Sequence, residues 1–296
     1  MAGLQGDLTG KAGVVTGAGS GIGRALCLAL ADAGMDVVAA DLDLAGAEET
    51  ARAVTARGTR GLAVECAVTD PEDVRALADE AWAGLDGIDL VWNNAGVVTS
   101  NALLDTPLED LRWVLEVNAV GPFIGMVEFG RRFVEQGTPC RVVTTGSEHS
   151  LGVANVLSAP YTASKHAVLA FSDVLRRETP DFVGVSVLCP GLVSTRLWEA
   201  DRNRPVEFGE ADDAVVVGHD MGRRLFEQGM PPDELAARAV AGIQRGDFLI
   251  VTHAHSRKFA AERCEEVLAA FDREELPGAD DRYDIEQIVQ RLITEG

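Results

Sequence analysis

Seven short apolar segments recur along this 296-residue chain, and the stretch between each two neighbours is long enough for a helix. The segments are residues 14–16, 37–40, 62–68, 90–92, 142–145, 183–189 and 248–251. A strand that is apolar throughout is buried on both faces, and strands of this kind joined by helices form parallel sheets with right-handed crossovers. The pattern therefore predicts a doubly wound α/β fold, with a parallel sheet of about seven strands and helices on both faces.

Composition and charge limit the domain count and the partners. Hydrophobic residues make up 47% of the chain, which is enough for one large core, and we expect residues 1–255 to form a single domain. The formal net charge of −21 repels phosphate backbones and anionic lipid headgroups, so we expect neither nucleic acid nor a membrane as a partner. A spanning helix needs roughly 18 consecutive apolar residues, and the sequence contains no such segment and no targeting pattern, so we expect a cytoplasmic protein.

The five cysteines are scattered singly and form no C-x-x-C pair. They are Cys27, Cys66, Cys140, Cys189 and Cys264. Most lie in apolar runs, and no motif beside them suggests an activating base. We expect reduced core residues.

Two segments lie outside the alternating pattern. Residues 196–230 lack a clear period and include Pro205, Trp198 and Phe208, which predicts a loop or lid after a strand. Residues 256–296 predict a helical C-terminal extension, because apolar side chains recur there at helical spacing. These side chains are Ile285, Ile288, Val289, Leu292 and Ile293. The stripe packs either on the same domain or on a neighbouring subunit, and amphipathicity alone leaves both open.

A glycine-rich run, TGAGSGIG at residues 16–23, follows the first apolar segment and precedes a helical pattern. Glycine adopts positive φ and has no Cβ, so Gly17, Gly21 and Gly23 allow a sharp turn that approaches a pyrophosphate. Ser20 and Ile22 then lie at the start of a helix, whose free N–H groups attract the phosphates. The run predicts a dinucleotide cofactor.

The second predicted strand ends at Asp41, and this residue bears on the choice of cofactor. A carboxylate there accepts hydrogen bonds from the adenosine ribose hydroxyls and repels a 2′-phosphate. Ser20 and Leu42 occupy positions where a basic side chain would compensate for that phosphate. These residues favour NAD over NADP, although Asp41 in an acid-rich chain could also simply cap a turn.

Tyr161 and Lys165 lie four residues apart at the start of an apolar periodic stretch, so they share one helix face. A free phenol has a pKa of about 10, and a neighbouring ammonium favours its ionised form. Tyr161 could then exchange a proton with an alcohol oxygen. The pair alone is weak evidence, because it arises often by chance.

In combination, these motifs resemble those of the short-chain dehydrogenase/reductase family, in the family's order and over nearly the whole chain. The matching elements are TGAGSGIG, Asn93-Asn94-Ala95-Gly96, Asn118 within VNAVG, Tyr161 with Lys165, and PGLVST at residues 190–195. Coincidence at every position and in this order is implausible. The resemblance implies a Rossmann-like catalytic domain in residues 1–255 and an NAD-dependent alcohol dehydrogenase or ketone reductase. It also implies a homo-oligomer, either a dimer or a homotetramer.

The resemblance also implies roles for four catalytic residues. Tyr161 would act as general acid or base, and Lys165 would lower the tyrosine pKa and bind the nicotinamide ribose. Ser147, at the end of the fifth strand, would hydrogen-bond the substrate oxygen, with Ser150 as the alternative serine. Asn118 would hold a water that links Lys165 to solvent.

Further residues are expected along the cofactor and the substrate. The resemblance implies that Asn94 and Gly96 lie along the cofactor. It also implies that the backbone of Val193, together with Thr195, binds the carboxamide and the phosphates. Ala95 and Pro190 belong to the same two motifs. For the substrate we expect Ser147, Tyr161, Glu148, His149, Trp198 and the loop 154–159, although Glu148 and His149 could be merely solvated. Val153, Val156 and Leu157 suggest an apolar pocket and thus a hydrophobic secondary alcohol or ketone.

One position departs from the family pattern. Where the family often has an aspartate that contacts the adenine amino group, this chain has Ala67, which leaves the Val68 backbone to contact the adenine edge. We expect weaker NAD binding by roughly 0.5 to 1.5 kcal/mol, the net value of one hydrogen bond.

Two rival functions remain open. His253 and His255 lie two residues apart after a predicted strand, but two histidines without a third ligand are weak support for zinc, so we expect no metal. A non-catalytic sensor of NAD(H) could keep the glycine turn. Because Asn118, Ser147, Tyr161 and Lys165 are all present, we favour the enzyme.

Overall fold

The computed structural model describes residues 3–152, 156–209, 213–273 and 284–295. The chain divides into two compact units, Met1–Ser256 and Arg257–Gly296. The larger unit contains the whole sheet and every candidate site residue.

The sheet of the larger unit has seven strands in the order β3-β2-β1-β4-β5-β6-β7, and all neighbouring strands are parallel. The strands are β1 (Ala12–Thr16), β2 (Asp36–Asp41), β3 (Gly61–Glu65), β4 (Leu90–Asn93), β5 (Cys140–Thr145), β6 (Val183–Cys189) and β7 (Leu249–Val251). The strand order reverses between β1 and β4, so their carboxyl ends diverge to leave a crevice for a ligand. This arrangement confirms the predicted doubly wound fold.

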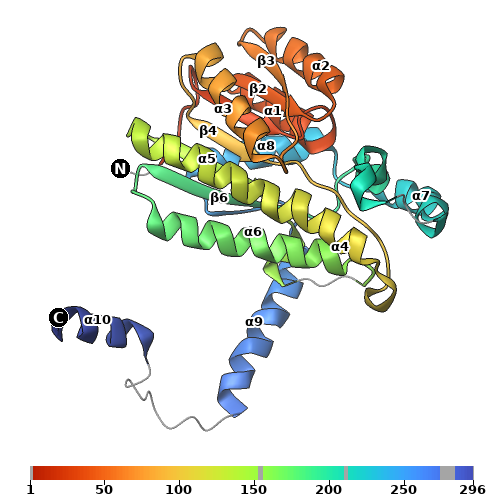
Figure 1. Ribbon diagram of the computed structural model, residues 1–296, viewed down its shortest axis with the longest axis vertical. Helices are drawn as coiled ribbons and strands as arrows, with labels where there is room; N and C mark the ends of the chain where they lie inside the picture. Colours follow the sequence, from red (N-terminus) through yellow and green to blue (C-terminus); the bar gives the residue numbers. More distant parts are fainter. Residues whose placement is uncertain (1–2, 153–155, 210–212, 274–283, 296) are drawn as a thin grey trace. The chain divides into compact units, whose positions relative to one another are not determined.

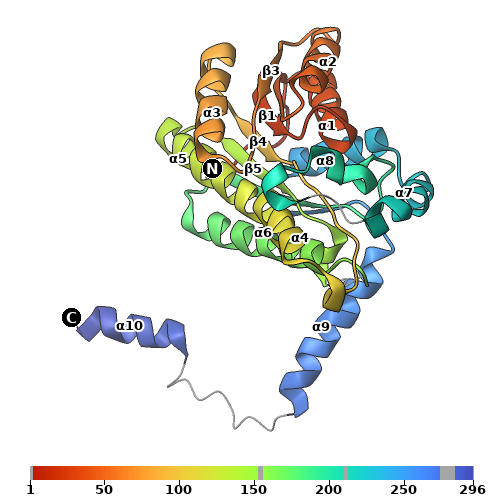
Figure 2. The same cartoon turned by 45° about the vertical axis from the view of Figure 1, so that its right-hand side comes forward.

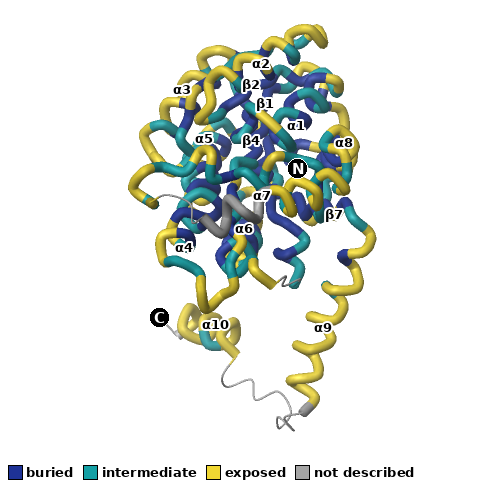
Figure 3. The backbone as a smooth tube through the Cα atoms, turned by 90° about the vertical axis from the view of Figure 1, so that its right-hand side faces the viewer, coloured by how far each residue is buried: buried dark blue, intermediate teal, exposed yellow. Residues whose placement is uncertain are grey.

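Helices cover both faces of the sheet (Figures 1 and 2). One face carries α1 (Gly21–Asp32), α2 (Leu44–Thr55) and α8 (Pro232–Arg245), and the other carries α3 (Pro71–Leu85), α5 (Gly121–Gln136) and α6 (Ala159–Glu178). Each face has its own apolar core: Leu26, Leu30 and Leu235 belong to the first, and Leu77 and Phe129 to the second. Figure 3 shows the central strands buried between these layers. Because both faces are covered, the strands consist mainly of apolar residues.

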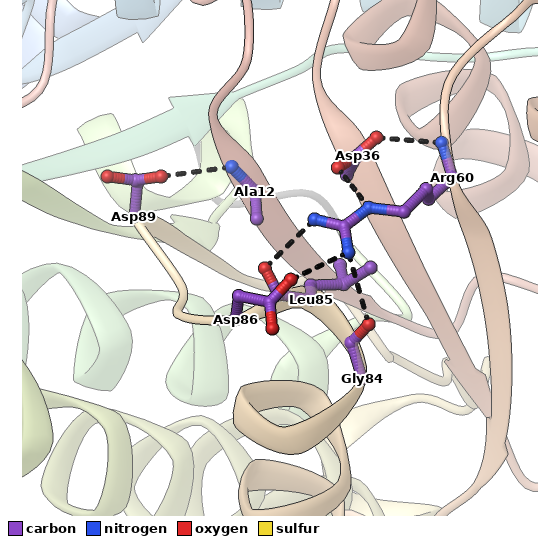
Figure 4. A network of polar contacts seen from close by, with 7 residues as sticks. All are labelled: Ala12, Asp36, Arg60, Gly84, Leu85, Asp86 and Asp89. Atoms are coloured by element: carbon purple, nitrogen blue, oxygen red, sulfur yellow. Dashed lines mark hydrogen bonds and ion pairs between the residues drawn. The ribbon is translucent and has the colours of Figure 1, made fainter.

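A polar network holds the amino ends of the strands together (Figure 4). Arg60, just before β3, bonds Asp36 at 2.7 Å and Asp86 at 3.0 Å, and it also donates to the Leu85 carbonyl. Asp89, before β4, accepts a hydrogen bond of 3.0 Å from the Ala12 amide at the start of β1. These contacts fix the edge of the sheet opposite the crevice.

The segment 196–230 is mostly helical, whereas the sequence predicted a loop or lid. It contains the 3₁₀ turns η4 (Leu197–Asn203) and η5 (Val206–Phe208) and the helix α7 (Asp213–Phe226). Gly222 obscures the helical pattern of α7 in the sequence. A glycine is needed at this position because a Cβ would lie only 3.0 Å from Cβ of Trp198. The ends of the segment meet where the Ser194 amide donates to the Met230 carbonyl at 2.9 Å.

The C-terminal extension consists of α9 (Ser256–Arg273) and α10 (Ile285–Glu295), as the helical spacing predicted. The apolar side chains of α10 are exposed, Ile285 by 74% and Leu292 by 66%. Whether they pack on the same domain or on a neighbouring subunit stays a prediction. Within the described ranges no helix is both long and apolar enough to cross a membrane.

All five cysteines are free thiols. Four of them are buried, as expected of core residues, but Cys264 on α9 is exposed. Burial raises the pKa of Cys66, Cys140 and Cys189 to about 12, so these thiols stay protonated near neutral pH.

Candidate active site

The glycine turn connects β1 to α1 in a conformation that requires glycine. Gly17 and Gly21 have φ values of +66° and +52°, and a Cβ on Gly23 would strike the carbonyl oxygen of Gly17. Ser20 is the N-cap of α1, and its exposed side chain makes no capping hydrogen bond. Amide groups of the first helical turn therefore remain available to an anion, so these residues fit a pyrophosphate.

Hydrogen bonds of Asn94 and Ala95 connect β1, β4 and β5 next to this turn. The Thr16 hydroxyl accepts from the amides of Asn94 at 3.0 Å and Ala95 at 3.2 Å, and the Asn94 side chain donates to the Thr16 carbonyl at 3.0 Å. Thr145, at the end of β5, donates to Oδ1 of Asn94 at 3.1 Å. Ala95 lies so close to Gly17 that a Cβ on Gly17 would be 2.7 Å from its Cα. The predicted cofactor residues of β1 and β4 thus share one surface.

Asp41 lies beside the turn with both carboxylate oxygens engaged. Oδ2 accepts from the Gly19 amide at 2.8 Å, and Oδ1 accepts from the Asp43 amide at 2.9 Å. Asp41 therefore does cap the turn, which was the alternative interpretation of this residue. A carboxylate has about four acceptor positions, so it can still accept from ribose hydroxyls. Leu42 beside it is 49% exposed.

Val68 and the loop after β6 border the same crevice. Val68 packs against Gly121, where a Cβ would lie 2.9 Å from its Cγ2. Thr195 reaches the glycine turn, since its Cγ2 would lie 3.2 Å from a Cβ on Gly21. The Pro190 carbonyl accepts from the Glu148 amide at 2.8 Å, which joins the loop after β6 to the loop after β5.

Ser147, Tyr161 and Lys165 lie together at the carboxyl edge of the sheet. Tyr161 is half-buried, the Ser147 hydroxyl is near enough to lower its pKa, and Nζ of Lys165 lies 5.4 Å from the centre of the Tyr161 ring. The alternative serine, Ser150, donates to the Lys165 carbonyl at 2.7 Å and accepts from the Ser147 amide at 3.1 Å. Because backbone groups occupy the Ser150 hydroxyl, the geometry favours Ser147.

Burial shifts the pKa values of the tyrosine and the lysine in opposite directions. It raises the pKa of Tyr161 to about 12, and the negative charge of Glu148 adds to this rise while the nearby Ser147 hydroxyl opposes it. It lowers the pKa of Lys165 to about 8. The sequence led us to expect that Lys165 lowers the tyrosine pKa. In the structure, loss of solvation dominates, and Nζ donates to the Thr145 carbonyl at 2.8 Å.

Asn118 lies in the π-helical turn η2 (Glu116–Val120), which joins α4 (Leu108–Leu115) to α5. Its side chain accepts from the Val97 amide and donates to the Val97 carbonyl, both at 2.8 Å, and also donates to the Ser164 hydroxyl at 3.2 Å. Asn118 and Lys165 both face Gly96: a Cβ there would lie 3.4 Å from Oδ1 of Asn118 and 3.8 Å from Nζ of Lys165. Asn118 therefore fixes the position of α6 next to Lys165.

The sequence analysis did not single out Thr145 and Ser164 as site residues. Thr145 holds Lys165 through its carbonyl, and its hydroxyl accepts from Nε1 of Trp92 at 3.1 Å. Ser164 connects Asn118 to α6. Thr145 could have been found, because it is a polar residue at the carboxyl end of a strand, where doubly wound folds bind ligands. Ser164 gives no such signal.

The expected substrate residues take up different positions. Nδ1 of His149 lies 2.7 Å from the Thr162 hydroxyl, and its ring meets the Tyr161 ring edge-on at 5.3 Å. Burial lowers the pKa of His149. Glu148 instead bonds Ser256 and His255. Trp198 is half-buried.

An apolar cluster borders Tyr161. Its buried members are Val97, Trp113, Val114 and Ala200, with Val117 and Phe208 packed against them. In the predicted substrate loop, Val156 and Leu157 are exposed, while residues 153–155 lie outside the described part of the chain. The cluster gives an apolar surface next to the phenol.

His253 has both ring nitrogens engaged by the backbone. Nδ1 accepts from the Gly191 amide at 3.0 Å, and Nε2 lies 3.1 Å from the Leu192 carbonyl. Among the described residues, no three ligand-type side chains are grouped so as to hold a metal ion.

Known proteins of one family are similar to this chain in sequence. The family model for short chain dehydrogenases matches residues 11–205. The 1-deoxy-11-beta-hydroxypentalenate dehydrogenase of Streptomyces exfoliatus is 44% identical over 220 residues, which span 73% of this chain and 78% of that protein. The L-2,3-butanediol dehydrogenase of Corynebacterium glutamicum is 33% identical over 192 residues, 64% of this chain and 74% of that protein.

A solved structure supports the same assignment. A short-chain dehydrogenase/reductase from Burkholderia phymatum, crystallised with NAD, superposes with a TM-score of 0.84 at 30% identity and covers 89% of this chain and 96% of that one. Fold, motif order and family match thus agree. The chain belongs to the short-chain dehydrogenase/reductase family.

Proposed function

We propose that this protein is an NAD-dependent oxidoreductase that interconverts a hydrophobic secondary alcohol and its ketone. The observation that carries the proposal is the grouping of Ser147, Tyr161 and Lys165, with the Lys165 amine 5.4 Å from the centre of the tyrosine ring. These groups lie at the carboxyl edge of the sheet, where doubly wound folds bind ligands.

A bound NAD would supply the hydride acceptor for alcohol oxidation, and NADH the hydride donor for ketone reduction. Tyr161 removes the hydroxyl proton in oxidation and returns it in reduction. The Ser147 hydroxyl orients the substrate oxygen and stabilises the charge that develops on it. Lys165 supplies a positive charge near the phenol and would hold the nicotinamide ribose by hydrogen bonds, while Asn118 keeps α6 in place.

Three residues support NAD as the cofactor. The Asp41 carboxylate is fixed beside the glycine turn by the Gly19 and Asp43 amides. At this position it favours two ribose hydroxyls and repels a 2′-phosphate. Ser20 and Leu42 are exposed and carry no positive charge.

The apolar cluster beside Tyr161 supports a hydrophobic substrate. Pockets lined by apolar and aromatic side chains take apolar ligands, and a few polar groups orient them. Two relatives are dehydrogenases of a hydroxylated pentalenate and of 2,3-butanediol. We therefore propose cyclic and short-chain secondary alcohols as the first compounds to test.

The test is NADH formation, followed by absorbance, with a panel of secondary alcohols. The panel contains 1-deoxy-11-beta-hydroxypentalenate, L-2,3-butanediol and alicyclic and aromatic alcohols, each with NAD and with NADP. We expect turnover with NAD that Tyr161→Phe abolishes. Calorimetric NAD binding without turnover on any member, by the wild type and the variant alike, would favour the alternative function, a non-catalytic NAD(H) sensor.

We also propose that the protein is a cytoplasmic homo-oligomer, either a dimer or a tetramer. Exposed apolar side chains on α5 and α6, such as Phe123 and Val174, support a contact between subunits. Light scattering coupled to gel filtration would give the mass, and a monomer would contradict the proposal.

A further inference from the structure

The carboxylate of Glu148, the residue after Ser147, bonds a segment more than a hundred residues away along the chain. Oε2 accepts from the Ser256 hydroxyl at 2.6 Å and lies 2.9 Å from Nε2 of His255. Only 13% of the Glu148 side chain is exposed. A largely buried carboxylate needs such partners, because burying a charge without hydrogen bonds is costly.

The backbone of Glu148 is held as well. Its amide donates to the Pro190 carbonyl at 2.8 Å, and the Ser147 hydroxyl, its neighbour in sequence, accepts from the His149 amide at 3.2 Å. Side chain and main chain together therefore connect the loop after β5 to the loop after β6 and to the residues that follow β7. Ser147 lies in the middle of this connection.

We propose that Glu148 is a positioning residue, which anchors the Ser147 loop to His255 and Ser256 and so holds the Ser147 hydroxyl in place next to Tyr161. The proposal rests on the function proposed above, in which Ser147 and Tyr161 perform the chemistry. A misplacement of about 1 Å at a reacting group can cost roughly 100-fold in rate, so an anchor of this kind has a measurable effect.

The negative charge of Glu148 also affects the pH dependence of the reaction, which can be measured. The titratable groups that interact with it are Tyr161 on α6, His149 in its own loop, and His253 and His255 after β7. Its negative charge adds to the rise of the Tyr161 pKa, and it opposes the lowering that burial causes in the pKa of His149 and of His253. Removal of that charge should therefore move the alkaline limb of the oxidation rate to lower pH, and an anchor that acted only through packing would not move it.

The test compares Glu148→Ala, Glu148→Gln, Ser256→Ala and the double variant Glu148→Ala/Ser256→Ala with the wild type. Glu178→Gln, on the exposed end of α6, is the control. We expect Glu148→Ala to lower kcat about 10-fold or more while the KM for NAD changes by less than about 3-fold. The amide oxygen of glutamine can still accept from Ser256, so Glu148→Gln should recover part of the lost kcat and still show the pH shift. The double variant should be no slower than Glu148→Ala, since both changes remove one contact.

Hydrogen exchange measures the anchor without any substrate. Amides of residues 147–152 should exchange faster in Glu148→Ala and Ser256→Ala than in the wild type and in Glu178→Gln, at unchanged circular dichroism. A folded Glu148→Ala variant with wild-type exchange in this loop would overturn the proposal, and so would wild-type kcat and pH profile. Absence of turnover in the wild type, by contrast, would overturn the proposed function. Hydrogen exchange of residues 147–152 would still test whether Glu148 holds the loop in place.

Discussion

Arg204 and Asp110 form a buried ion pair, with 2.6 Å between Nη1 and Oδ1 and only 6% of each side chain exposed. Arg204 belongs to the segment after β6, and Asp110 to α4. The guanidinium also donates to the Phe208 carbonyl and lies 5.0 Å from the centre of the Trp113 ring. The pair thus fixes the first part of this segment beside the apolar cluster at Tyr161.

We predict that Asp110→Asn destabilises the protein by about 3 kcal/mol, because it leaves a buried guanidinium without its counter-charge. It should also raise KM for an apolar substrate more than it lowers kcat, since Phe208 and Ala200 lose their fixed positions. Urea unfolding and steady-state kinetics measure the two effects. Asp173→Asn, which breaks the exposed pair with Arg176, is the control and should cost less than about 1 kcal/mol. Equal losses in both variants would contradict the prediction.

A second prediction concerns the pH dependence of the two reaction directions. Burial raises the pKa of Tyr161 to about 12, so the phenol is protonated at neutral pH. Oxidation needs the phenolate and should become faster from pH 7 to pH 10, whereas ketone reduction needs the phenol and should not. Profiles of kcat/KM in both directions report this group in the free enzyme. Tyr161→Phe should lower kcat by about 100-fold or more and leave calorimetric NAD binding nearly unchanged. An oxidation rate that is flat over this range would contradict the assignment of Tyr161.

The sequence predicted the sheet well because the strands are buried on both faces, so apolar runs such as β5 and β6 had no solvent-facing positions to obscure them. It predicted helix α7 poorly, because Gly222 is dictated by a contact with Trp198 that lies outside the helix. The glycine turn and the pair Tyr161 and Lys165 follow from local spacing. The direction of the Tyr161 pKa shift and the partners of Glu148 depend on tertiary burial and on residues such as Ser256, far along the chain, and no local pattern reveals these.

We further predict that Lys165→Met stabilises the protein at pH 7 while it abolishes turnover. Burial lowers the pKa of Lys165 from 10.5 to about 8. In the unfolded chain the amine keeps its usual pKa. Above pH 10.5 the amine is neutral in both states and Lys165 does not lower the free energy of unfolding. As the pH falls towards 8, the unfolded chain binds the proton first, and the free energy of unfolding decreases. At pH 7 the lowered pKa of Lys165 reduces the free energy of unfolding by about 3 kcal/mol. Methionine carries no charge and avoids this cost, but it loses the hydrogen bond to the Thr145 carbonyl, so the net gain is smaller.

Urea unfolding of Lys165→Met at pH 7 and at pH 10.5 separates this effect from general repacking. The gain relative to the wild type should be largest at pH 7 and should shrink at pH 10.5. Lys258→Met, at an exposed position on α9, should change neither value by more than about 0.5 kcal/mol. A gain of equal size at both pH values would show that charge burial is not its cause.

Asp41→Ala should weaken the preference for NAD over NADP. The variant removes the repulsion of a 2′-phosphate and the acceptor for the ribose hydroxyls, so we expect the ratio of kcat/KM for the two cofactors to fall about 10-fold or more. Asp43→Ala is a matched control, because Asp43 lies in the same loop but caps α2 through the Gly46 amide. Its cofactor ratio should stay at the wild-type value. An unchanged ratio in Asp41→Ala would remove Asp41 from the cofactor site.

Ala67→Asp should strengthen NAD binding. The methyl side chain of Ala67 has no atom that could accept a hydrogen bond from an adenine amino group, and an aspartate would supply one. One such bond is worth about 0.5 to 1.5 kcal/mol, so we expect the dissociation constant for NAD to fall roughly 2- to 10-fold in calorimetry. ADP-ribose contains the adenine but not the nicotinamide and should gain equally, whereas nicotinamide mononucleotide should gain nothing. The new carboxylate will lie near Asp73, which accepts from the Ala67 amide at 3.1 Å. Ala67→Asn avoids this repulsion, so it should strengthen ADP-ribose binding as well, and failure of both variants would place the adenine away from residue 67.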